Sequence, residues 1–261
     1  MKKIFTSLIV TLFLFSFLLC EVGAAPTKSI SWYTTRSKDH KQALVPPDLS
    51  FVESHGGVYI DHLHGDDCPE KVVYLTFDAG YENGNVESVL NTLKDTNTPG
   101  AFFVLKHFVS ENSALVERMV NEGHLICNHT ANHPNLAAAS KEKIAAEIKE
   151  LEVAVEAVTG SGTKPYFRPP EGCFSRELLE HVSALGYKTV FWSIAYADWD
   201  NQRQPEPRVA LDTLLSRMHN GAVILLHPTS KTNAEILPAF IAALKEQGYR
   251  FGTLDELCRA R

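Results

Sequence analysis

From Lys71 to the C-terminus, short apolar runs alternate with stretches whose apolar residues recur at helical spacing. The longest helical pattern places Ile144, Ile148, Leu151 and Val155 on one face. Seven runs have the length and composition of buried strands: 72–77, 101–104, 124–126, 166–168, 189–194, 222–226 and a last one beginning at 251. Strands that alternate with helices pair in parallel, which predicts either an open doubly wound sheet or a barrel. No GxGxxG or Walker loop follows the first run, which disfavours a nucleotide-binding sheet.

The first 65 residues differ from this pattern. Lys2 and Lys3 precede an apolar run, and small residues follow at 22–25, so residues 1–24 are predicted to be a signal peptide. An uncleaved membrane anchor is the alternative. Residues 25–65 are polar and show no sustained period, which predicts an N-terminal extension before a catalytic domain at 66–261. The protein is therefore expected to be secreted or extracytoplasmic. Four cysteines follow the signal segment, and their spacing leaves any disulfide connectivity open.

Composition narrows the class of protein. With 261 residues, 44% of them hydrophobic, the chain can bury a full core. Its net charge of −6 is dispersed along the sequence, which argues against a nucleic-acid partner because phosphate binding requires basic patches. We expect a monomer that meets a membrane only through its signal segment.

Ionisable side chains stand at or just past the ends of five predicted strands. They are Asp78, the pair His129 and His133, Arg168, Asp198 and His227. In a barrel the carboxyl ends of the strands share one rim, where active sites of such folds are built. The sequence therefore predicts a single site that contains all of these residues.

The residue types suggest hydrolysis assisted by a metal ion. His129 and His133 are four residues apart, and in a helical turn this spacing points both imidazoles the same way, as two ligands of one ion require. With Asp78 as base, such an ion would activate water for attack on a carbonyl. Each residue also has a simpler explanation: Asp78 could cap its loop, the histidines could lie on the surface, and His227 could be a core histidine.

Five segments resemble, in order, the five motifs of the NodB-type polysaccharide deacetylases, which form carbohydrate esterase family four. They are Thr76-Phe77-Asp78-Ala79-Gly80, His129-Thr130-Ala131-Asn132-His133-Pro134, Arg168-Pro169-Pro170-Glu171-Gly172, Asp198-Trp199 and Ile224-Leu225-Leu226-His227. The resemblance extends from about Lys71 to the C-terminus. It implies a distorted (β/α) barrel of about seven parallel strands and removal of N-acetyl groups from a glycan with the help of a divalent metal ion.

The resemblance also implies roles for individual residues. Asp78 corresponds to the general base, His129 and His133 to the metal ligands, and His227 to the general acid. Arg168 would position Asp78, while Asp198 would support Arg168 or His227. The loop of Glu171 and Gly172 would bind the oxyanion through the Glu171 N–H, and Trp199 and Leu225 would form the wall around the acetyl methyl.

The chain departs from the family pattern at Ala79, where a second aspartate usually ligates the metal. Zinc or a similar ion would then rest on two histidines, water and substrate, and bind more weakly. The segments 76–84, 193–199 and 227–235 resemble the branch that makes muramic δ-lactam in spore cortex, which also lacks this aspartate. That branch acts on N-acetylmuramic acid in peptidoglycan. Glu171 would repel its lactyl carboxylate if the Glu171 side chain faced the groove.

Two alternatives stay open at this point. One is a deacetylase of N-acetylglucosamine in peptidoglycan or in chitin-like chains. The other is a glycan-binding module without catalysis, which would explain Ala79. The presence of both Asp78 and His227 argues against the second, since binding alone requires neither an acid nor a base.

Overall fold

The computed structural model describes residues 28–259, and its centre is one curled, parallel sheet. Five strands pair in chain order: β3 (Lys71–Ala79), β4 (Ala101–Val104), β5 (Leu125–Asn128), β6 (Lys164–Phe167) and β8 (Lys188–Val190). Two later strands, β9 (Ala222–Leu226) and β10 (Tyr249–Phe251), both pair with β3. An early strand, β2 (Gly57–Val58), pairs with β8.

The chain beyond β8 closes the sheet into a distorted barrel. Ile194 forms a parallel bridge with Ile224 of β9, and the Leu225 N–H donates to the Ile194 carbonyl at 2.9 Å. Because β9 lies next to β3, this contact joins the two ends of the strand series. The predicted barrel is confirmed, and all seven predicted strands are present. The short strand β2 was not predicted.

Five predicted strand limits were wrong. The run predicted at 72–77 is a strand from Lys71 to Ala79, and the one predicted at 166–168 runs from Lys164 to Phe167. The run predicted at 189–194 is a strand only to Val190, because its second half bends toward β9. Phe251 ends the last strand instead of beginning it. The strand predicted at 124–126 runs from Leu125 to Asn128, which brings His129 directly to its end.

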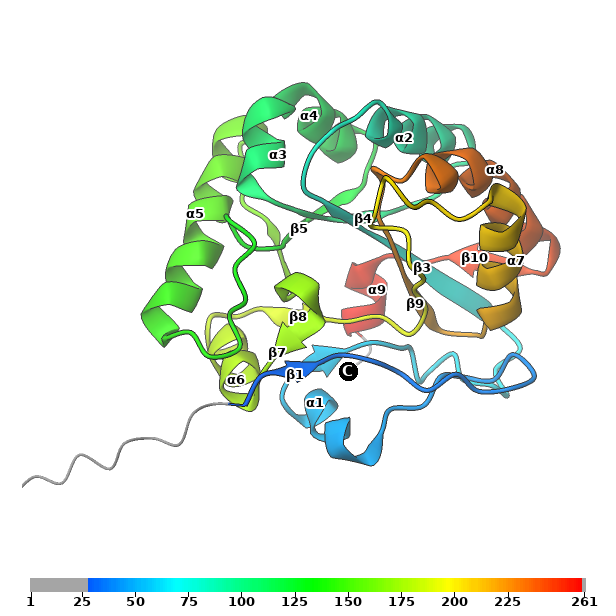
Figure 1. The fold of residues 1–261 in the computed structure, drawn as a ribbon, viewed down its shortest axis with the longest axis horizontal. Helices are drawn as coiled ribbons and strands as arrows, with labels where there is room; N and C mark the ends of the chain where they lie inside the picture. Colours follow the sequence, from blue (N-terminus) through cyan, green and yellow to red (C-terminus); the bar gives the residue numbers. More distant parts are fainter. Residues whose placement is uncertain (1–27, 260–261) are drawn as a thin grey trace, which may run out of the picture.

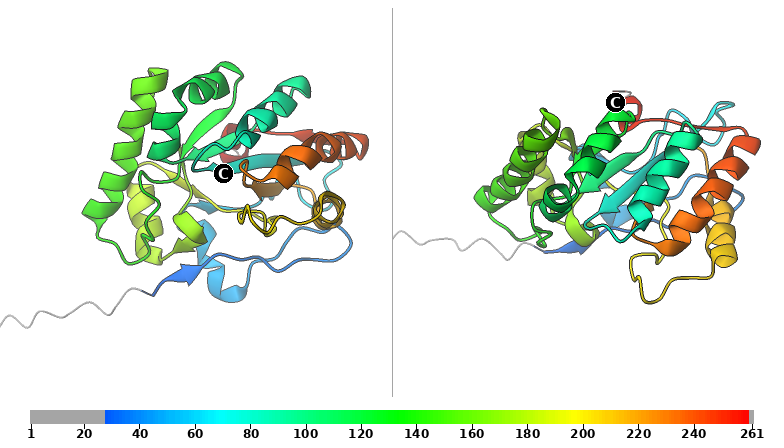
Figure 2. Two further views of the ribbon diagram at one scale, coloured as in Figure 1. Left: turned by 45° about the horizontal axis from the view of Figure 1, so that its top comes forward. Right: turned by 90° about the horizontal axis from the view of Figure 1, so that it is seen from above.

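Helices form the outer layer around these strands, as the two further views in Figure 2 also show. In Figure 1 they follow one another around the periphery, while the N-terminal segment runs along the remaining side. The helices in this layer are α2 (Asn85–Asp95), α3 (Lys106–Glu111), α4 (Ser113–Asn121), α5 (Lys141–Thr159), α7 (Pro207–Arg217) and α8 (Lys231–Glu246). Two more helices complete the set. The first, α6 (Arg176–Ala184), packs beside β8, and the second, α9 (Leu254–Arg259), is the last helix of the described chain.

The alternation of side chains along β3 decides what faces the barrel interior. Leu75, Phe77 and Ala79 belong to the apolar cluster shared with the outer helices. The intervening residues point the other way, so Thr76 and Asp78 face inward. Asp78 is the last of this inward series, which places its carboxylate at the C-terminal rim of the barrel.

The stretch predicted to be an N-terminal extension is packed into the domain from residue 28 onward. Within it, β1 (Ile30–Ser31) pairs with β7 (Cys173–Phe174), and β2 joins the main sheet. A short helix, α1 (Phe51–Ser54), and a 3₁₀ turn, η1 (Pro47–Leu49), lie between them. Buried residues of the segment pack against α5 and α6: Trp32, Leu49, Val52, Tyr59 and Ile60. Elements of two to four residues leave no periodic signal, which is why the sequence pattern missed them.

Other sequence-based considerations concern the signal segment, membrane spans and the cysteines. The predicted signal peptide, residues 1–24, lies outside the described residues. Within 28–259, no helix is both long and apolar enough to cross a membrane. The four cysteines within 28–259 are all free thiols, and no disulfide joins any two of them.

Truncation of one buried side chain tests whether the N-terminal segment belongs to the domain. Ile60 is fully buried between this segment and the helices around it. Ile60→Ala is therefore expected to lower the free energy of unfolding by about 2–5 kcal/mol, through lost apolar burial and the cavity left behind. Chemical denaturation would measure this loss, with the exposed Leu63→Ala as control. Equal stability of the two variants would show that burial of the Ile60 side chain contributes nothing to the stability of the domain.

Candidate active site

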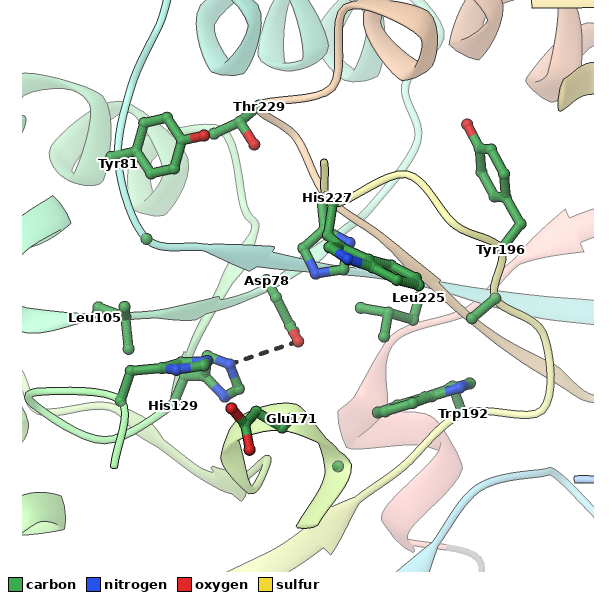
Figure 3. A pocket seen from close by; sticks show the side chains of 15 residues that line it. Asp78, Tyr81, Leu105, His129, Glu171, Trp192, Tyr196, Leu225, His227 and Thr229 are labelled. Carbon is green, nitrogen blue, oxygen red and sulfur yellow. Dashed lines mark ion pairs between the residues drawn. The ribbon is translucent and has the colours of Figure 1, made fainter. Parts of the chain in front are cut away.

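A cavity of about 780 Å³ opens at the C-terminal rim of the barrel. Figure 3 shows Asp78, His129 and His227 directed into it from three different strand ends. The remaining residues that line it are Gly80, Tyr81, Leu105, His133, Glu171, Gly172, Trp192, Ala195, Tyr196, Trp199, Leu225 and Thr229. The structure thus brings the predicted site residues together around one cavity or directly behind its wall.

Arg168 holds Asp78 in place from the protein interior. Its side chain is completely buried, and Nη1 donates to Asp78 Oδ1 at 2.7 Å. Other donors of the same guanidinium reach the Thr76 hydroxyl at 2.9 Å and the Val190 carbonyl at 3.0 Å. The guanidinium carbon also lies 4.1 Å from the centre of the Phe103 ring. Because so many contacts fix the guanidinium, Asp78 has one well-defined position.

These contacts control the charge of Asp78. Burial alone would raise the pKa of this carboxyl group, but the charge of Arg168, followed by those of His129 and His227, holds the pKa below its ordinary value. Asp78 is therefore ionised at neutral pH although its side chain is only 10% exposed. An ionised carboxylate at the wall of a cavity can accept a proton from water.

His129 and His133 lie side by side, although they are not in a helical turn as predicted. Their ring centres are 5.0 Å apart, at an angle of 72°. The chain reverses between them because Thr130 and His133 both adopt positive φ angles, 72° and 57°. The Asn128 side chain stabilises this turn by accepting from the Thr130 N–H at 3.0 Å. The predicted proximity is correct, but it results from a tight loop.

The two histidines have ring nitrogens suited to binding a metal ion. His129 Nδ1 donates to the Arg168 carbonyl at 2.8 Å, which leaves Nε2 directed toward Asp78 Oδ2 at 3.6 Å. This backbone bond is the usual device that orients a metal-binding imidazole. Burial lowers the pKa of His129 to about 4, so its ring is neutral at pH 7 and keeps a free lone pair. Within 28–259, no group of three or more His, Cys, Asp and Glu residues is arranged as a metal site, so the protein ligands would be these two histidines.

His227 faces Asp78 from the end of β9 and is held from behind by Asp198. His227 Nδ1 donates to Asp198 Oδ1 at 2.8 Å, and the His227 backbone N–H donates to Oδ2 at 2.8 Å. The Asn233 amide donates to the same carboxylate at 2.6 Å, and Tyr196 donates in turn to Asn233. Burial would lower the pKa of His227, but the bond and charge of Asp198 raise it above its ordinary value. Of the two predicted partners of Asp198, the structure selects His227.

The Glu171 loop forms another wall. It belongs to a 3₁₀ turn, η2 (Pro170–Gly172), in which Glu171 and Gly172 have φ angles of 59° and 64°. A Cβ on Gly172 would lie 2.7 Å from the Trp192 ring, so only glycine fits there. In Figure 3 the Glu171 carboxylate lies on the His129 side of the cavity. Its side chain therefore faces the groove.

The apolar wall contains both predicted and unpredicted residues. Leu225 and Trp199 line the cavity as predicted, and Trp199 lies with its ring centre 6.5 Å from that of His227. Trp192 and Tyr196 were not predicted. They come from the irregular segment after β8, whose side chains follow no strand or helix period. The only available sequence signal was the aromatic content of 191–199.

Comparison with known proteins agrees with this geometry. Residues 65–190 match the family model described as polysaccharide deacetylase. The peptidoglycan-N-acetylmuramic acid deacetylase PdaA of Bacillus subtilis is 40% identical over 242 residues, which cover 91% of this chain and 89% of PdaA. The solved structure of PdaA, described as a family 4 carbohydrate esterase, superimposes with a TM-score of 0.84 and 39% identity, over 89% of this chain and 98% of that one.

Two further relatives are described as a deacetylase of another sugar and as a pseudoenzyme. The peptidoglycan-N-acetylglucosamine deacetylase PgdA of Listeria monocytogenes is 34% identical over 191 residues, covering 72% of this chain and 39% of PgdA. A structure from Bacillus anthracis described as a CE4 family pseudoenzyme has a TM-score of 0.70 and 29% identity, over 77% of this chain and 68% of that one. The identity with PdaA along nearly the whole length, together with the family model, shows that the chain belongs to the polysaccharide deacetylase family.

Proposed function

We propose that this protein removes the acetyl group from N-acetylmuramic acid in peptidoglycan, on the route to muramic δ-lactam in spore cortex. The family assignment establishes a polysaccharide deacetylase, a hydrolase of amide bonds. The similarity to PdaA supports the muramic acid substrate. The observation that carries the catalytic part is the placement of Asp78 and His227 at one cavity, each fixed by a buried partner of opposite charge.

The two residues have complementary proton states. Asp78 is kept ionised by Arg168 and takes a proton from the attacking water. His227 is kept protonated to higher pH by Asp198 and donates a proton to the departing nitrogen. The acetyl methyl would lie against Leu225 and Trp199, and the Glu171 N–H would donate to the developing oxyanion. A divalent ion such as zinc, held by His129 and His133, would lower the pKa of the attacking water and polarise the carbonyl.

Mass spectrometry of purified peptidoglycan after incubation with the enzyme tests this proposal. Muramic acid residues that have lost an acetyl group are expected with the wild type and not with Asp78→Asn. Loss of acetyl groups only from N-acetylglucosamine residues would instead assign the second substrate.

One observation favours that second substrate. Glu171 faces the groove and would repel the lactyl carboxylate of muramic acid. N-acetylglucosamine lacks this carboxylate. If it is the true substrate, Glu171→Gln should leave its turnover unchanged, whereas turnover of a muramyl glycan should improve in this variant.

The proposed metal ligands can be tested by binding alone. His133→Ala is expected to abolish measurable zinc binding, since only one of the two proposed histidine ligands then remains. Isothermal titration calorimetry of the apoprotein would measure this loss, with His181→Ala on α6 as control. Zinc affinity equal to that of the wild type would remove His133 from the ligand set.

The role of position 79 can be tested by restoring the family's aspartate. Ala79→Asp is expected to tighten zinc binding by about tenfold, or ~1.4 kcal/mol, if the new carboxylate reaches the ion. Ala79 is fully buried and shares an apolar cluster with Ala131, which lies between the two histidines. A variant with lower stability and no gain in zinc affinity would show that position 79 faces this cluster and not the ion.

A further inference from the structure

A second cavity, of about 350 Å³, adjoins the catalytic one. Trp192 and Ala195 line both cavities, so one short segment of chain lies between them. The other side of the second cavity is formed by the N-terminal segment, residues 32–43, and by residues at the end of α7. No acidic side chain lines it, whereas Arg36, Lys41 and Arg217 do.

The three cations are available to a ligand. Among the ion pairs of residues 28–259, none involves Arg36, Lys41 or Arg217. Arg36 donates to the Ser216 carbonyl and Arg217 to the Ala195 carbonyl, each at 2.6 Å. Each of these bonds fixes a guanidinium and uses only part of its five N–H donors. Arg217 is thereby tied to a residue that also lines the catalytic cavity.

A histidine that lines the same cavity has a buried ring nitrogen without a hydrogen-bond partner in the described part of the chain. His219 is 2% exposed, and its Nδ1 donates to the Asn220 carbonyl at 2.9 Å. In the neutral ring, Nε2 is then a hydrogen-bond acceptor, and this atom has no partner in the described part of the chain. A sugar hydroxyl or an amide N–H would satisfy it. Tyr33, which is 53% exposed, adds a ring face to the same cavity.

We propose that this cavity is a subsite for a carboxylate carried by the glycan next to the sugar that is deacetylated. This inference rests on the proposed function. The cations would pair with the carboxylate, and His219 Nε2 would accept from a neighbouring hydroxyl or amide. In peptidoglycan such a carboxylate belongs either to the lactyl group of a muramic acid residue or to a stem peptide. The subsite would offset the repulsion from Glu171 by attracting negative charge at an adjacent position.

The double variant Arg36→Gln/Lys41→Gln tests this subsite, because both side chains are exposed and their loss leaves the core intact. We expect KM for a muramyl glycan to rise about three- to tenfold with little change in kcat, while KM for neutral chitin oligomers stays within twofold. Added salt should raise KM of the wild type on the muramyl glycan and have less effect on the variant. The control is Lys141→Gln/Lys149→Gln, which removes two exposed charges from α5.

Two glycan preparations separate the sources of the carboxylate. A rise in KM on glycan stripped of its peptides assigns the lactyl group, and a rise only on peptide-bearing glycan assigns the stem peptide. Unchanged KM on both, or an equal rise for the control variant or for chitin oligomers, would overturn the subsite.

A binding measurement keeps this test independent of the proposed reaction. Calorimetric titration of both glycans into Asp78→Asn, with and without the double substitution, should show the same three- to tenfold loss of affinity. If the wild type deacetylates no muramic acid and this loss is still observed, the subsite stands and the proposed substrate fails. If deacetylation proceeds and the double substitution leaves affinity unchanged, the proposed function stands and the subsite fails.

Discussion

Asp78→Asn is expected to lower kcat/KM for deacetylation by about 10²–10⁴-fold or more, because an amide cannot take the proton from the attacking water. The amide oxygen can still accept the bond from Arg168 Nη1, so the geometry around the buried guanidinium should persist. The measurement is acetate release from peptidoglycan at a fixed pH and zinc concentration.

Two controls separate lost chemistry from lost structure. Asp212→Asn on α7 changes the same residue type away from the cavity and should retain full activity. Zinc binding and thermal unfolding of Asp78→Asn should remain measurable, although removing the negative partner of Arg168 will cost some stability. Activity of Asp78→Asn within a few-fold of the wild type would exclude Asp78 as the base.

His227→Ala should depress kcat by about 10²–10⁴-fold with little change in substrate affinity. Amide hydrolysis expels an amine, which leaves poorly until it is protonated. An acetate ester expels an alkoxide that needs less help, so the same variant should lose less activity on the ester. Comparable losses on ester and amide would give His227 a structural role.

The pH profile provides an independent test of the same residue. A general acid must be protonated, so activity falls as the pH rises through the pKa of His227. Because Asp198 raises this pKa, the alkaline limb of the wild type should lie at a higher pH than an unperturbed histidine would give. Asp198→Asn should move the limb to lower pH, and His227→Ala should remove it. A limb that stays in place in both variants would have to arise from another group.

Much of the fold was predictable because the buried strands are continuous apolar runs. The predicted strands 101–104 and 222–226 coincide with β4 and β9, whose residues are all buried. Such a run can be recognised as a buried strand from its own residues alone. Because the strands alternate with helices along the chain, parallel pairing can be predicted as well. The two-residue strand β2 could not be found in this way, since its place in the sheet depends on pairing with β8, more than a hundred residues away.

The site was predictable where it coincides with strand ends and not where it depends on loops. His129, Arg168 and His227 each follow directly after a strand, so a prediction from strand ends locates them. Asp198 lies eight residues past the end of β8, and only the structure decides between its two predicted partners, Arg168 and His227, in favour of His227. The positive φ angles of Thr130 and His133 likewise leave no mark in the sequence, because neither residue is glycine.

The pairing of β1 with β7 has a consequence for how the enzyme is made. Ser31 and Cys173, which adjoin across this pair, are separated by 142 positions, and the Trp32 N–H donates to the carbonyl of Gly172 in the loop proposed to bind the oxyanion. Residues 30–32 can therefore dock only after the chain has been synthesised beyond Phe174. Until then the loop of Glu171 and Gly172 lacks its hydrogen bond from the backbone N–H of Trp32. Proteolytic removal of residues 30–32 would take away this contact with the Gly172 loop without removing any of the proposed catalytic side chains.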